Sequence, residues 1–303
     1  SYSNNYGDGN VRATFGYTSQ YGVVEKTDLE RITGRLNIQH RFFDDKLLVG
    51  VQSSISRIND ETAPLAGTAG FRGDVLGASY SANPTWPLNP DFEPGGALIH
   101  PQNFLVNTQN RSITDRILVN GSAEYSITPE LKGKVNVGYD LAEGQNTSVL
   151  GGNINGLTGI QNQGFGVYNT LERESYLLEG TLNYTKDLGD DNLNVLVGYS
   201  FQDFRTKGRN AAGRGFGTSD LDQMGRDLRT SVDQAGNSID GRFQQYFYGT
   251  NTPTLQVNRL LPTVVAGESA GNDFIRKVQG ITADTFDNTD EIQSFFARVN
   301  YNL

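Results

Sequence analysis

The side chains that could support catalysis or bind a metal are few and scattered in this sequence. Its two histidines are His40 and His100, and neither has a carboxylate or a second histidine at the spacing of metal ligands. Cysteine is absent, which excludes disulfide and thiolate chemistry. We therefore expect no metal site, no cofactor, no catalytic residues and no enzyme.

Three polar segments resemble ligand-binding motifs only superficially. Gly213–Gly217 (GRGFG) is rich in glycine but lacks the spacing of a phosphate-binding loop, and we interpret it as a flexible loop. Asp8-Gly9 and Gly189-Asp190-Asp191 lack the spacing of an EF-hand, so solvated turns are the better interpretation.

The bulk composition excludes some classes of function. The net charge is −9, and the pI of about 4.8 argues against nucleic-acid binding, which needs a basic face. Mean hydropathy is −0.47, and no apolar run approaches the roughly 18 residues of a transmembrane helix. Transmembrane β-strands remain possible, because they alternate apolar and polar residues and give a weak hydropathy signal.

Alternation of apolar and polar residues is the main signal in the chain. In Leu131–Leu141 the odd positions are mostly apolar, whereas the even ones include Lys132, Lys134, Asn136 and Asp140. Successive side chains of a strand point to opposite faces, so one face is apolar and the other polar. About eight segments share this pattern: Val11–Thr18, Arg31–Phe42, Leu47–Ile55, Arg116–Ile127, Leu131–Leu141, Tyr176–Tyr184, Leu193–Gln202 and Ser294–Leu303.

Short and long connections alternate between these segments. Tight polar turns are predicted at 43–46, 128–130 and 187–191. Longer connections are predicted at 22–28, 59–110, 144–170 and 207–290. This is the pattern of outer-membrane barrels, which have short periplasmic turns and longer extracellular loops. The predicted fold is therefore all-β, an antiparallel transmembrane barrel segment of about eight strands.

Aromatic residues gather near the ends of the predicted strands and in two of the loops. Girdles at the two membrane interfaces would explain the strand-end aromatics, although aromatics also favour strands in general. In the loops, the candidates for contact with a substrate or partner are Trp86, Phe243, Tyr246 and Tyr248. The alternative for each of them is packing within its own loop.

Four segments resemble the SusC/RagA-like TonB-dependent transporters of Bacteroidetes, in the order of that family. Val11–Asp28 (VRATFGYTSQYGVVEKTD) is similar to an early barrel hairpin, and Asp28–Gly50 to the strand pair that follows it. Asn83–Pro90 (NPTWPLNP) resembles the loop motif NPT.P..N, and Gln293–Tyr301 (QSFFARVNY) resembles QS.F.RVNY. Single motifs are weak, but their ordered combination is more specific.

The resemblance implies a 22-strand barrel in the cell outer membrane of a Gram-negative bacterium. It also implies a plug domain, coupling to TonB, a SusD-like surface lipoprotein, and import of a bulky glycan or peptide. Residues 1–303 resemble only the early part of that barrel domain; the plug, the TonB-binding segment and the remaining strands have no counterpart here. The predicted function is thus active import across the outer membrane.

Two alternatives remain open from the sequence. One is a passive porin or small structural barrel, closed by pairing Val11–Tyr21 with Ser294–Leu303. The other is a soluble surface adhesin. An eight-strand barrel has an interior filled by side chains and could not pass a bulky nutrient, so strand pairing at these two segments separates a small barrel from a part of a larger one. Partition into detergent would separate the adhesin, and a plug domain would separate the transporter from the porin.

Overall fold

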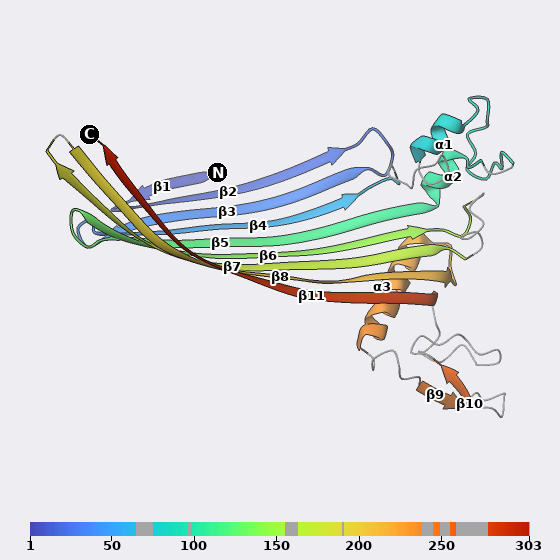
Figure 1. Ribbon diagram of the computed structural model, residues 1–303. Helices are drawn as coiled ribbons and strands as arrows, with labels where there is room; N and C mark the ends of the chain where they lie inside the picture. The colour runs from blue at the N-terminus through green and yellow to red at the C-terminus, as the bar shows by residue number, and fades with distance from the viewer. Residues whose placement is uncertain are drawn as a thin grey trace.

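The computed structural model describes residues 1–64, 75–95, 98–154, 163–189, 191–237, 245–248, 255–258 and 278–302. Within these ranges the chain forms a nine-stranded antiparallel sheet with strand order β1-β2-β3-β4-β5-β6-β7-β8-β11 (Figure 1). The strands are β1 (Tyr2–Tyr6), β2 (Gly9–Tyr21), β3 (Asp28–Phe42), β4 (Leu47–Glu61), β5 (Thr108–Ser126), β6 (Leu131–Leu150), β7 (Phe165–Leu188), β8 (Asp191–Phe216) and β11 (Val278–Asn302). The all-β prediction is confirmed.

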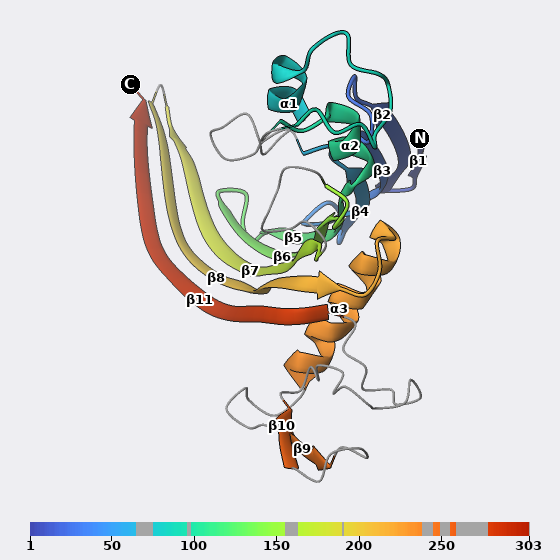
Figure 2. The ribbon, with the colours of Figure 1, turned by 90° about the vertical axis from the view of Figure 1, so that its right-hand side faces the viewer.

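The sheet is curved but not closed. Seen along the strands it forms an open trough, with β1 at one edge and β11 at the other (Figure 2). β2 pairs with β1 and β3, and β11 pairs with β8, so the segments Val11–Tyr21 and Ser294–Leu303 do not pair with each other. The chain therefore does not form the closed eight-strand barrel that was one of the alternatives from the sequence.

Several strands are longer than the sequence predicted. The expected loop at 144–170 contains the end of β6 and the start of β7, and the one at 207–290 contains the end of β8 and the start of β11. Gly213–Gly217 was wrongly expected to be a flexible loop, since β8 continues to Phe216 and Gly213 pairs with Gly166. The alternation fades there because the outer face of β8 carries small residues such as Ala211 and Gly213 instead of large apolar ones. β1 is a ninth strand that the sequence analysis missed.

The tight turns all lie at one end of the sheet. They join β1 to β2, β3 to β4, β5 to β6, and β7 to β8, while the longer connections lie at the opposite end (Figure 1). Phe43, Asp44 and Asp45 have positive φ angles of 55°, 51° and 65°, and Gly189 has a φ of +84°. Asp tolerates this left-handed conformation better than most residues, and Gly adopts it without steric cost.

Three helices lie in the longer connections: α1 (Val75–Ser81), α2 (Pro101–Val106) and α3 (Leu221–Asn237). Residues 245–248 and 255–258 form a separate two-stranded hairpin of β9 and β10. α2 begins at Pro101, whose missing N–H is not needed in the first turn, and His100 Nδ1 accepts a hydrogen bond from the Gln102 N–H at 3.2 Å. None of the described helices is long and apolar enough to cross a membrane.

Strand register assigns the residues of every strand to one of two faces. Val137 on β6 pairs with Gly121 and Leu178, and Leu178 pairs with Phe201 on β8, so these residues share the convex outer face. Asn136 and its partners point to the concave face. Arg35, Lys134 and Asn136 therefore lie on the concave face, and Val137, Tyr139, Val197 and Tyr199 on the convex one.

The convex face changes from apolar to charged along each strand. On β6 it carries apolar residues from Leu131 to Leu141 and then Glu143. With about 3.3 Å of rise per residue and a strand tilt of about 40°, this stretch spans about 25 Å, the height of the apolar band of an outer-membrane barrel. On β7 the change occurs between Tyr176 and Glu174. The strands thus continue beyond the apolar band toward the helices.

The two faces should differ in their tolerance of charge. Val137→Arg places a cation in the middle of the apolar band, where it costs about 2–4 kcal/mol in lipid, and we expect barrel assembly to be impaired. Asn136→Arg is the matched control, because its neighbour Glu179 already accepts a hydrogen bond from Asn136 and can pair with the new arginine. Heat-modifiable migration of the outer-membrane protein measures assembly; equal tolerance at both positions would contradict the assignment of faces.

The two ends of the sheet should be exposed on opposite sides of the membrane. An epitope inserted after Gly95, an exposed residue in the connection between β4 and β5, should bind antibody on intact cells. An epitope inserted after Asp45, in the tight turn between β3 and β4, should bind only after the outer membrane is permeabilised. The reverse pattern would mean that the orientation is wrong.

Candidate functional site

The concave face carries a polar hollow of about 890 Å³. Neighbouring strands β3 to β8 contribute its walls, and each of these strands is hydrogen-bonded to a neighbour on both sides. Its lining is rich in hydroxyl, amide and guanidinium groups. These are Thr33, Ser54, Ser56, Thr114, Ser175, Thr206, Asn120, Gln202, Arg31, Arg35, Arg116 and Arg173.

Positive charge predominates on the concave side of this hollow. Arg116 is held by Asp140 in a two-pronged pair, with Nε to Oδ1 at 2.9 Å and Nη2 to Oδ2 at 2.6 Å. Arg31 Nε lies 3.4 Å from Thr33 Oγ1 and has no carboxylate partner among the described residues. The side chains of Arg35 and Arg173 make no hydrogen bond or ion pair with any described residue. The hollow can therefore accept anionic groups as well as hydrogen-bonding ones.

The charges of the convex face are, by contrast, mostly paired. Arg57 donates to Asp115 from Nη2 at 2.6 Å, Lys207 lies 2.6 Å from Glu172, and Arg205 Nη2 lies 2.6 Å from Asp287. These pairs lie directly above the apolar band. We call the six residues the outer charged belt.

Two tyrosine hydroxyls link the apolar band to this belt. Tyr139 and Tyr176 both donate to the Glu174 carboxylate, at 3.0 Å and 2.7 Å, and their ring centroids are 5.1 Å apart. Their rings stay on the apolar side while their hydroxyls reach the charged side, as interfacial aromatics do. At the other end of the band, the ring of His40 lies between Tyr6 and Phe42. These positions agree with the two predicted aromatic girdles.

Helix α3 packs on the convex face near its extended end. Met224, Leu228 and Val232 recur at helical spacing and are fully buried, and the cluster around Leu228 includes Tyr168 on β7 and Ala211 on β8. The Asp220 side chain caps the helix by accepting from the Gln223 N–H at 2.7 Å. α3 thus covers part of the outer face beyond the belt.

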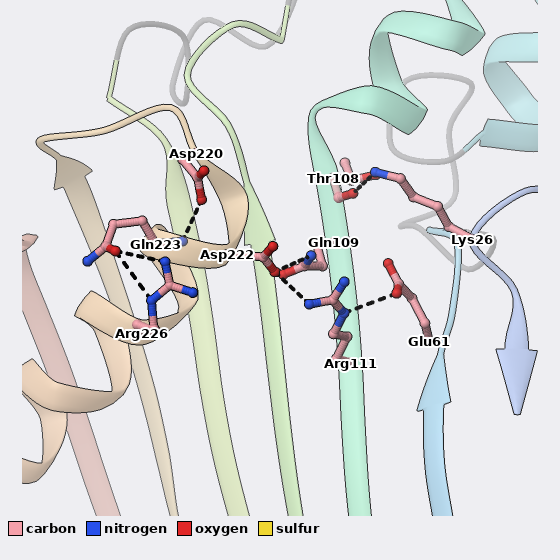
Figure 3. Close-up of polar contacts among 9 residues, drawn as sticks. All are labelled: Lys26, Glu61, Thr108, Gln109, Arg111, Asp220, Asp222, Gln223 and Arg226. Atoms are coloured by element: carbon pink, nitrogen blue, oxygen red, sulfur yellow. Dashed lines mark hydrogen bonds and ion pairs between the residues drawn. The ribbon is translucent and has the colours of Figure 1, made fainter. Parts of the chain in front are cut away.

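A polar network connects α3 to the strand ends (Figure 3). Arg111 on β5 bridges Glu61 on β4 and Asp222 on α3, and Gln109 also donates to Asp222. The hydrogen bond from Gln109, together with the positive charge of Arg111, lowers the pKa of Asp222 below its usual range. The carboxylate therefore keeps these contacts at neutral pH.

Lys26 adds the connection between β2 and β3 to the same region. Its Nζ donates to the Thr108 backbone carbonyl at 2.8 Å. Burial lowers the pKa of Lys26 because it disfavours the charged ammonium, although nearby Glu61 opposes the shift.

The aromatic candidates from the sequence lie in different surroundings. The Trp86 ring is 6.0 Å from the rings of both Phe92 and His100, so it takes part in a three-ring cluster of its own connection. Tyr246 and Tyr248 belong to β9, and Phe243 lies outside the described residues. Contact of any of these with a substrate or partner stays a prediction.

One motif was overlooked in the sequence analysis. Residues 267–271 read GESAG and fit the G-x-S-x-G pattern of a hydrolase nucleophile elbow, which needs a strand–turn–helix context. They lie outside the described residues. Both histidines that could activate a serine have other contacts: His40 lies among aromatics, and His100 caps α2. Within the described ranges, no three His, Cys, Asp or Glu side chains gather as a metal site would require.

Several known proteins are similar to this chain in sequence or fold, although no family model matches it. The chain is 27% identical over 221 residues to TonB-dependent receptor P3 of Formosa agariphila, covering 68% of this chain and 21% of that protein. It is 23% identical over 229 residues to TonB-dependent receptor SusC of Bacteroides thetaiotaomicron, covering 65% and 22%.

Solved structures share the fold over nearly the whole chain. The RagAB peptide importer in its closed-closed state aligns with a TM-score of 0.66 and 18% identity, over 99% of this chain and 29% of that one. Its open-open state gives a TM-score of 0.63 and 16% identity. The chain is therefore similar to part of the barrel wall of SusC- and RagA-like transporters. It spans about a fifth of the length of the two curated relatives.

The sequence predicted the arginines of the hollow only as members of a polar face. Period-two alternation placed Arg31, Arg35 and Arg116 opposite apolar neighbours, whereas Arg173 lay between the predicted loop at 144–170 and the predicted strand Tyr176–Tyr184. Register brings them together: Arg116 pairs with Ala142, and Ala142 pairs with Arg173. A one-residue change of register would move these side chains to the other face, so the sequence signal alone was insufficient.

Anchoring of α3 to the outer face can be tested by one substitution. Leu228→Asp introduces a carboxylate at a fully buried position, and we expect α3 to detach because an unpaired buried charge is strongly unfavourable. Trypsin added to intact cells should then cleave the protein after Arg226 or Arg229. Thr230→Asp, at an exposed position of the same helix, should leave cleavage unchanged. Equal protection of both variants would show that α3 is held by other contacts.

Proposed function

We propose that this chain forms part of the wall of a TonB-dependent transporter that imports a bulky nutrient, an oligosaccharide or oligopeptide, across the outer membrane of a Gram-negative bacterium. The single observation that carries the proposal is the open trough, apolar outside and polar inside, with its two edges at β1 and β11. The likeness to TonB-dependent receptors supports it.

The open edges require further strands in a membrane. Unpaired backbone groups are not tolerated in lipid, so β1 and β11 need neighbours that close the barrel. We propose that these strands, a plug domain and a TonB-contacting segment belong to the same polypeptide outside the 303 residues. A wider barrel than eight strands then leaves a lumen that a plug can occupy and a bulky nutrient can cross.

The helix-bearing end of the wall is the proposed docking side for a SusD-like surface lipoprotein. The tight turns leave the opposite end compact, whereas α1, α2 and α3 enlarge this end (Figure 1). The connection between β4 and β5, with its Trp86 cluster, and the segment containing β9 are the candidate contacts. The membrane lipid would contact the apolar band only.

Dependence on energy separates the proposal from a passive porin. Uptake of the nutrient by cells that produce the whole transporter should be lost when TonB is deleted or the proton gradient is dissipated. The amount of protein in the outer membrane should be unchanged in the same cells. Uptake that persists without TonB would favour the porin, and recovery of the protein in the aqueous phase without detergent would favour a soluble adhesin.

A further inference from the structure

The hollow on the concave face differs in charge from the rest of the molecule. The chain as a whole has a net charge of −9, yet the concave-face residues of the hollow include four arginines and one acidic residue, Asp140. Because Asp140 is bound by Arg116, the positive charge of Arg31, Arg35 and Arg173 is not balanced by any carboxylate among the described residues. All three side chains belong to exposed residues.

The arginines lie at the level where the outer face becomes charged. Arg31 precedes Ile32 on β3, Arg116 precedes Ile117 on β5, and these isoleucines are among the last apolar residues of the convex face. In the proposed barrel, the arginines therefore lie at the outer boundary of the membrane, where the lumen opens toward the helix-bearing end. A molecule entering the barrel from that side meets this hollow on its way in.

Spacing of the arginines suits a ligand with repeated charges. Arg31 and Arg35 lie four residues apart on the same face of β3, about 13 Å at about 3.3 Å per residue, and Arg173 on β7 shares the register row of Arg116. Arg35 lies one row closer to the tight turns, in the row of Ser54 and Asp140. Guanidinium groups bind carboxylate and sulfate groups with two parallel hydrogen bonds.

The remaining lining favours a carbohydrate over a peptide. Peptides are commonly recognised by an open strand edge or an apolar groove, and the strands of this hollow are all paired on both sides. Between Ile58, Leu118, Leu177 and Phe204 of the same face, serine, threonine, asparagine and glutamine side chains surround the arginines. Such groups both donate and accept hydrogen bonds, as the hydroxyl groups of a sugar do.

We propose that this hollow binds acidic oligosaccharides, with Arg31, Arg35 and Arg173 recognising their carboxylate or sulfate groups. The inference rests on the proposed import function and specifies its substrate class. Binding should weaken as ionic strength rises, because exposed charges are screened by salt.

The test measures binding to the whole transporter, purified from outer membranes in detergent, by isothermal titration calorimetry. Oligogalacturonides are compared with the same oligomers after complete methyl esterification, and sulfated galactan oligomers with their desulfated counterparts. We expect at least one acidic probe to bind about tenfold more tightly than its neutral counterpart, the effect of about one charge-assisted hydrogen bond. The two pairs distinguish carboxylate from sulfate recognition.

Substitutions locate the site. Arg31→Gln, Arg35→Gln and Arg173→Gln together should abolish the preference for the acidic probe. Lys134→Gln is the control, because it removes a positive charge from the same concave face near the tight turns, outside the hollow. If Lys134→Gln weakens binding as much as the arginine substitutions do, net charge rather than the hollow explains the preference and the proposal is wrong.

Two other results would also overturn it. Equal binding of acidic and neutral probes, or binding of neither, rejects the acidic substrate class, while TonB-dependent uptake of a neutral oligomer would leave the import function standing. If the arginine variants bind acidic probes normally but admit large antibiotics into cells, the arginines hold a part of the transporter such as its plug. Uptake that persists in cells without TonB, measured separately, is the result that rejects the import function itself.

Discussion

Hydrogen bonding between neighbouring strands is the constraint on which the rest of this structure depends. A chain that crosses lipid with strands must pair every backbone N–H and C=O group. The ladders from β1 through β8 to β11 do this between neighbouring strands, with a register irregularity near the start of β11, and they leave only the outer edges of the sheet open. Once the ladders fix the register, the face of each side chain is fixed as well. The apolar band, the concave hollow and the seat of α3 all follow from that register.

The two faces handle charge differently. On the convex face, cations and anions meet in pairs directly above the apolar band, so little charge is left unbalanced where the wall leaves the lipid. On the concave face, Arg31, Arg35 and Arg173 have no acidic partner among the described residues. Paired exposed charges contribute little to stability, whereas unpaired ones retain their capacity to bind a ligand. This asymmetry is the reason for assigning recognition to the concave side.

The part of the sheet beyond the apolar band is held by contacts of another kind. Leu228 and its neighbours on α3 bury apolar surface against Tyr168 and Ala211, and Arg111 joins β4, β5 and α3 through Glu61 and Asp222. Burial of apolar side chains stabilises a structure where it removes them from water. This packing therefore suits the part of the sheet beyond the apolar band. The wall thus has an apolar convex band along one part of its strands and a helix-supported surface beyond it.

The alternating pattern was enough to predict the central parts of eight strands, the side chains that share a face within each strand, and the order of turns and loops, because a period of two is a local property of the chain. Leu131–Leu141 displays it directly. Tertiary structure alone decided that β8 extends through Gly213 to Phe216, that α3 covers the outer face, and that Arg116 and Arg173 share a row. Each of these depends on register between segments far apart in the chain: a shift of one residue would exchange the faces without changing the sequence pattern.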